Sequence, residues 1–196
     1  MPRLVRTGCC ALALLLSACA SPRPPPQLYQ LRADPPITAP AAPRADVPMF
    51  QLLPVSLPEL LERDAILVPQ GRSGVVALTG HRWAEPLRDA VPRLLRQDLA
   101  TLLGADRVWV APLPAGVQPL RQVRVDILSF QVDEPRRAVN LQVRWTVSQT
   151  GGTQPAQSRV DTVVAPVQGS DVDAIAAAHR LAVWQLAQLL GDALAR

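Results

Sequence analysis

The sequence contains no lysine, so all 20 of its basic residues are arginines. They stand against 16 acidic residues, which gives a formal net charge of +4. The arginines are spread along the chain instead of forming a basic patch, so no nucleic-acid partner is expected. Aromatic residues make up only 4% of the 196 positions. A chain of this length fits one domain, and its core must come mainly from Leu, Val and Ala.

Reactive side chains are also scarce, with three cysteines and two histidines in the whole chain. Neither His81 nor His179 has a second His or Cys at the spacing of metal ligands, so no metal site is predicted. The chain has no G-x-S-x-G, P-loop or dinucleotide-binding motif. No pair of carboxylates is singled out for acid–base work. We therefore expect no catalytic residues, no cofactor and no enzymatic activity.

The N-terminus has the pattern of a lipoprotein signal peptide over residues 1–18. Arg3 and Arg6 precede an apolar run of about 10 residues, which is too short for a permanent membrane span. The sequence Leu-Ser-Ala-Cys that ends at Cys19 resembles the bacterial lipobox. That resemblance implies a mature chain that begins at Cys19 and carries palmitate-type acyl chains there. Ala20 and Ser21 then favour an outer-membrane location facing the periplasm.

Residues 19–48 are rich in Pro and Ala and are expected to form a tether behind the acylated cysteine. Fully extended, such a tether would reach on the order of 100 Å. The segment 27–31, Gln-Leu-Tyr-Gln-Leu, interrupts this composition and alternates like a short strand. We expect it to pair at the edge of the folded domain, with Tyr29 as an anchor.

The folded domain is expected to occupy residues 49–196. Its first half predicts strands at 50–55, 65–68, 75–79 and 108–110, with a helical turn at 57–62. A longer helix should follow His81 and end at Gly104, with apolar residues at three- and four-residue steps. Pro92 lies inside this pattern, so we expect a kink or a delayed helix start there. The helix and the strand at 108–110 should complete a β-α-β unit.

The second half predicts antiparallel strands and a final helix. Alternation changes phase within residues 123–132, which indicates a β-bulge near Ile127 and Leu128. Further strands are expected at 139–147 and 158–165, and a helix at 171–194 with a capping box from Ser170. His179 falls on the apolar face of that helix and is interpreted as a structural histidine. The fold class is therefore α/β: a single domain with a mixed, largely antiparallel sheet flanked by two main helices.

The sequence His-Arg-Trp-Ala-Glu-Pro-Leu at residues 81–87 is the densest group of distinctive side chains. One interpretation is a packed corner in which Trp83 covers the core and Arg82 is stacked or paired. The other is an interface with a partner or a second copy, because Trp and Arg are enriched at binding hot spots. On that interpretation the contact residues are His81, Arg82, Trp83, Glu85 and Pro86.

These residues together resemble the ABC-type transport auxiliary lipoproteins, the PqiC-like family. The resemblance is carried by the lipobox, Tyr29-x-Leu31, Val55-x-Leu57-Pro58, residues 81–87, Val91-Pro92-Arg93, and Arg144-Trp145. It implies a mixed sheet with flanking helices. It also implies partners, namely an MCE-domain protein and ABC transporter components, in lipid transport that supports membrane integrity. A homo-oligomer is a further expectation, and a structural or assembly lipoprotein for an outer-membrane complex stays open as an alternative.

Overall fold

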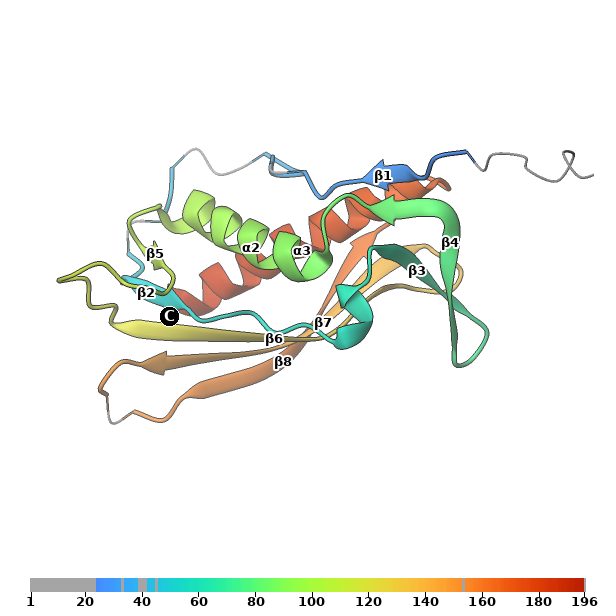
Figure 1. Cartoon of the computed structure of the whole chain (residues 1–196). Coiled ribbons are helices and arrows are strands. Elements are labelled where there is room, and N and C mark those ends of the chain that lie inside the picture. The colour runs from blue at the N-terminus through green and yellow to red at the C-terminus, as the bar shows by residue number, and fades with distance from the viewer. Residues whose placement is uncertain (1–23, 33, 39–41, 45, 153, 196) are drawn as a thin grey trace, which may run out of the picture.

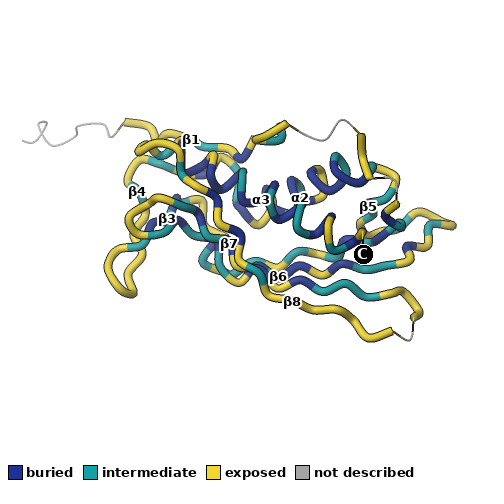
Figure 2. The backbone as a smooth tube through the Cα atoms, turned by 180° about the vertical axis from the view of Figure 1, so that it is seen from behind, coloured by how far each residue is buried: buried dark blue, intermediate teal, exposed yellow. Residues whose placement is uncertain are grey.

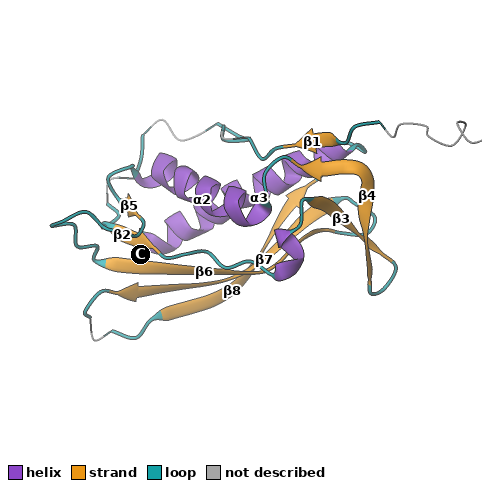
Figure 3. Ribbon diagram, viewed as in Figure 1, coloured by secondary structure: helices purple, strands orange, loops and turns teal. Residues whose placement is uncertain are grey.

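The structure is a computed structural model that describes residues 24–32, 34–38, 42–44, 46–152 and 154–195. Two long helices lie against one face of a five-stranded sheet, and a three-stranded sheet adjoins one end (Figures 1 and 3). The elements are β1 (Gln27–Tyr29), β2 (Phe50–Leu52), η2 (Glu59–Glu62), β3 (Ala65–Gln70), β4 (Gly74–Trp83), α2 (Leu87–Leu103), β5 (Val108–Trp109), β6 (Arg121–Val132), β7 (Ala138–Gln149), β8 (Gln157–Pro166) and α3 (Val172–Leu194).

The larger sheet has the order β5-β2-β6-β7-β8. Strands β6, β7 and β8 are antiparallel, whereas β2 runs parallel to both β5 and β6. Because α2 lies between β2 and β5 in the chain, the predicted β-α-β unit is present. Strands β3 and β4, which also lie between them in sequence, pair instead in the smaller sheet β1-β4-β3. The predicted fold class is confirmed, with its strands divided between two sheets.

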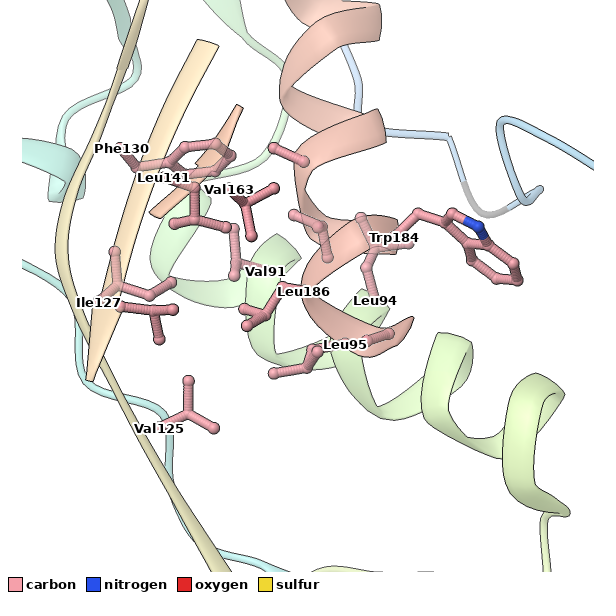
Figure 4. Packing of buried hydrophobic residues seen from close by; sticks show 14 of the residues in the cluster. Val91, Leu94, Leu95, Val125, Ile127, Phe130, Leu141, Val163, Trp184 and Leu186 are labelled. Carbon is pink, nitrogen blue, oxygen red and sulfur yellow. The ribbon is translucent and has the colours of Figure 1, made fainter. Parts of the chain in front are cut away.

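The phase change in β6 has the predicted cause. The β6–β7 register shifts between Ile127 and Ser129, so one extra residue, Leu128, is accommodated there and is partly exposed. The shift returns Phe130 to the same face as Ile127, and both are buried. That face packs on Val91, Leu94 and Leu95 of α2 and on Leu186 of α3 (Figure 4). The bulge thus keeps a continuous apolar face towards the helices.

Three local expectations are corrected. Helix α2 begins at Leu87, so its start is not delayed to Pro92. Pro86 is the last residue with extended backbone, and the Pro86 carbonyl accepts hydrogen bonds from the N–H groups of Asp89 and Ala90. Strand β4 continues through Trp83, so the expected corner at 81–83 is strand. Asp171, not Ser170, caps α3, since its Oδ1 accepts from the Ala174 N–H at 2.8 Å. Gly104, in contrast, ends α2 as predicted and adopts a φ of 103°.

Several described residues of the N-terminal segment pack onto the domain, beginning with β1. Strand β1 pairs at the edge of the smaller sheet, as predicted. It runs parallel to the end of β4, with Tyr29 opposite Trp83. Further along, Leu31 is 2% exposed and Val47 is fully buried. The expectation of a free tether extending to residue 48 is therefore too long, because both apolar side chains are part of the core. Figure 2 shows that most of the described residues of this segment are exposed where it runs past the helices.

Candidate functional site

The end of β4 is held between two backbone neighbours. On one side, β1 places Leu28 opposite Arg82, and the carbonyl of Tyr29 accepts from the Ala84 N–H at 2.7 Å. On the other side, the Asp64 carbonyl accepts from the Trp83 N–H at 2.6 Å. Side chains alternate across an extended strand, so Arg82 points away from the face that carries Trp83. This alternation decides which residues of the motif reach solvent.

Trp83 lies in the core and is only 5% exposed. Its ring meets the His179 imidazole edge-on at 5.3 Å between centroids, and Phe130 lies 4.7 Å from the same imidazole. The structure thus has Trp83 covering the core, which leaves little of its side chain accessible to a partner. Beside these rings is a cavity of about 20 Å³, which is room for about one water molecule.

His179 is a buried structural histidine, as predicted. It is 4% exposed, and its Nδ1 lies 2.8 Å from the Ile175 carbonyl oxygen one helical turn earlier. Since a carbonyl only accepts, Nδ1 carries the proton and donates. Burial lowers the pKa of His179 from 6.5 to about 4, while the bond to Ile175 opposes this shift. The imidazole is therefore neutral near pH 7.

Two other residues of the motif start helix α2. The Glu85 carboxylate accepts two hydrogen bonds from Arg93. Its Oε1 accepts from Nε at 3.3 Å, and its Oε2 accepts from Nη2 at 2.5 Å. Pro86 precedes the first helical residue with an extended ψ of 137°, and Leu87 is then buried at 2% exposure. A carboxylate that binds an arginine one to two turns into the helix ties the entering chain to α2. Glu85 and Pro86 therefore have structural positions within the subunit.

His81 and Arg82 form the more accessible part of the motif. The His81 Nδ1 lies 2.8 Å from the Tyr29 hydroxyl, which joins β4 to β1 through side chains as well as backbone. Arg82 pairs with Asp64 at 2.7 Å, and both side chains are about half exposed, at 55% and 52%. Exposed ion pairs of this kind contribute little to stability. Arg82 is thus the motif residue most available to a partner.

A buried ion pair that the sequence did not predict joins the two long helices. Arg180 of α3 donates two bonds to Asp98 of α2, at 2.7 and 2.8 Å, and the side chains are 5% and 1% exposed. Burial raises the pKa of Asp98 above its usual value, and the bonds from Arg180 oppose that rise. The Arg180 Nε also donates to the Arg32 carbonyl at 2.7 Å. One guanidinium therefore connects both helices to the N-terminal segment.

The periodicity of α2 carried a signal for this pair. Asp98 stands four residues after Leu94 and four before Leu102, both of which are buried, so it falls on the apolar stripe and not on its margin. Arg180 similarly stands between Ala176 and Val183 on α3. A lone charge of each sign on two apolar faces indicates a pair, because an isolated buried charge is far too costly. Sequence alone does not say that these two faces meet.

The larger hollows of the molecule are open grooves. One of about 380 Å³ lies between Gln30, Arg32 and residues 34–36 on one side and the first turns of α3 on the other, and Arg180 contributes to its lining. Another of about 240 Å³ lies among Pro54, Val55, Pro92 and Val110. In the part of the chain that the structure describes, no group of His, Cys, Asp and Glu is arranged to hold a metal ion. Within the same residues, neither long helix has the length and hydropathy needed to span a membrane.

The fold and motif define a class of protein: an α/β domain with its N-terminal segment clamped on top by β1 and Arg180. The family model for the ABC-type transport auxiliary lipoprotein component matches residues 29–190. The chain therefore belongs to that family, as its motifs predicted. It is an auxiliary lipoprotein component of an ABC-type transport system. Cys19, the expected lipidation site, lies outside the described residues.

Several solved structures share the fold. A crystal structure of an uncharacterised protein has a TM-score of 0.67 at 17% identity and covers 87% of this chain and 99% of its own. A protein of family DUF330 from Xanthomonas campestris has a TM-score of 0.65 at 19% identity, covering 86% and 95%. A PelC dodecamer from Paraburkholderia phytofirmans reaches 0.41 at 12% identity over 78% and 93%, too low to support an argument about assembly. No curated protein matches the chain.

Proposed function

We propose that this protein is an outer-membrane lipoprotein, acylated on Cys19, that faces the periplasm and docks an MCE-domain partner of an ABC-type lipid transporter. In this role the protein binds and positions its partner and catalyses no reaction. Loss of the protein weakens the envelope. The family match supports the transport role. The lipobox and the residues after Cys19 support the anchor and its membrane.

The observation that carries the docking role is the clamp on the N-terminal segment. Strand β1 begins at Gln27, about eight residues after Cys19, so an extended linker would reach only about 25 Å. A reach of about 100 Å would require Leu31 and Val47, which are both buried, to leave the core. The domain is therefore held close to the membrane and serves as a platform.

The clamp also orients this platform. Strand β1 lies beside the end of β4, whereas the C-terminus lies at the opposite end of the molecule, near β2 (Figure 1). The end with β1 and β4 thus faces the anchor. Arg82 is exposed at that end, and we propose it as the residue of the motif that contacts the partner, with His81 beside it.

Crosslinking in cells followed by purification of the acylated protein tests this function. The MCE-domain partner should co-purify with the wild-type protein, and Arg82→Glu should reduce its recovery. Arg124→Glu on the exposed face of β6 makes the same charge change elsewhere and should leave recovery unchanged. Absence of any MCE or ABC component from the wild-type crosslinks would overturn the proposal. A purely structural role for Arg82 would instead lower the thermal transition of the purified variant.

A further inference from the structure

Strand β8 forms a free edge of the larger sheet. It is ten residues long and pairs with β7 on one side only. In Figures 1 and 2, which show the molecule from front and back, no other described segment runs along its outer side. A long edge strand leaves a row of unpaired backbone groups that can pair with another strand. This edge is separate from the surface at Arg82.

The register identifies which backbone groups face outward. The Val167 N–H donates to the Arg137 carbonyl, so residues 137 and 167 form a hydrogen-bonded pair. Pairs alternate along an antiparallel ladder, and Ala138 stands opposite Pro166. Residues 159, 161, 163 and 165 therefore direct their N–H and C=O groups to β7. The groups that point to the free edge belong to Ser158, Val160, Thr162 and Val164.

The side chains of β8 restrict what can pair there. Val160 and Val164 are 51% and 55% exposed on the face away from the helices. On the opposite face, Asp161 accepts a bond from the Trp145 Nε1 at 2.7 Å, and Arg159 is exposed next to it. Among the described residues no ion pair involves Arg159. Charges on the core-facing side of an edge strand disfavour pairing with an uncharged strand.

We propose that the partner of this edge is β8 of a second copy, paired antiparallel about a two-fold axis at Val160. In this register Val160 faces Val160 of the second copy, and each Arg159 stands opposite the other copy's Asp161. The outward backbone groups of β8 permit several registers between the two copies, and the charges on the strand distinguish among them. An axis at Asp161 would set two carboxylates face to face, and one at Thr162 would leave Arg159 opposite Ala165. Only the axis at Val160 gives every charge an opposite charge across the strands.

Charge reversal in the full-length acylated protein in detergent tests the contact, with sedimentation velocity as the measurement. The wild-type protein should form dimers. Arg159→Glu and Asp161→Arg each turn both cross-strand pairs into like-charge pairs, so each should weaken dimerisation about tenfold or more. An equimolar mixture of the two variants should restore it, because each strand then meets its opposite charges. Arg124→Glu should dimerise like the wild type.

Cysteine crosslinking tests the register without changing the charges. Val160→Cys should give a disulfide-linked dimer on oxidation, because facing residues in a hydrogen-bonded pair have Cα atoms about 5.5 Å apart. Thr162→Cys is the matched control and should not crosslink, and oxidised wild-type protein controls for Cys19. A monomeric wild-type protein, unchanged assembly of Arg159→Glu, or crosslinking of Thr162→Cys in place of Val160→Cys would overturn the proposal. Each of these outcomes leaves the MCE-partner proposal untouched.

Discussion

Removing the Asp98 carboxylate should be among the most destabilising single changes outside the apolar core. Asp98→Ala would leave the Arg180 guanidinium, 5% exposed, without its anionic partner between the two helices. Breaking a buried pair in this way costs about 3–5 kcal/mol. Since domains unfold with only about 5–15 kcal/mol, much of the total stability would be lost. Urea denaturation followed by far-UV circular dichroism measures the change.

Replacing both partners separates the cost of an orphaned charge from the value of the pair. The double variant Asp98→Leu with Arg180→Met has no buried charge, and such replacements are often neutral or stabilising. It loses the bond from Arg180 to the Arg32 carbonyl, which is worth about 1 kcal/mol. We therefore expect the double variant to be more stable than Asp98→Ala. Residues 28–32 of the double variant should exchange amide hydrogens faster than in the wild type. Asp98→Ala should not show this increase, because it keeps the bond from Arg180 to the Arg32 carbonyl.

The exposed pair Arg82–Asp64 is the matched control for this experiment. Both side chains are about half exposed, so Asp64→Ala should cost less than about 1 kcal/mol. A cost for Asp98→Ala no larger than that for Asp64→Ala would contradict the predicted penalty of an unpaired buried charge. So would a double variant that is destabilised by as much as Asp98→Leu and Arg180→Met summed.

The remaining predictions concern titration, packing and the anchor. The pKa of His179 is about 4 in the folded protein, against an ordinary value of 6.5, so the unfolded chain binds more protons between pH 4 and 6.5. The free energy of unfolding should therefore fall by roughly 3 kcal/mol on acidification through this range. His179→Gln should remove this pH dependence and His81→Gln should keep it, as followed by urea denaturation at several pH values. Trp83→Ala should cost about 3–5 kcal/mol in thermal unfolding and Arg82→Ala less than about 1, because one side chain is buried and the other half exposed; equal losses would contradict the assignment of Trp83 to the core. Cys19→Ala should abolish acylation and sedimentation with outer membranes, and an unchanged mass and membrane association would remove the anchor from the argument.

Local patterns in the sequence predicted most of the elements. The alternation in β6 contained the bulge at Leu128, and the position of Gly104 indicated where α2 ends, because both depend on neighbours a few residues away. The two interpretations of residues 81–87 could not be separated in this way. The local sequence around Trp83 is compatible with a buried strand and with an exposed corner. The residue that packs on Trp83 is His179, which lies nearly 100 residues later in the chain.

The sequence by itself determined the family, the order of strands and helices along the chain, and the apolar faces of α2 and α3, since these follow from motif and periodicity. Only the tertiary structure decided that the strands form two sheets, that Leu31 and Val47 pack into the core, and that Asp98 meets Arg180. Each of these depends on which surfaces come together across 50 or more residues. A pair of opposite charges, or a short apolar strand, is stable in the core only when the facing element supplies its partner, and periodicity along one segment does not identify that element.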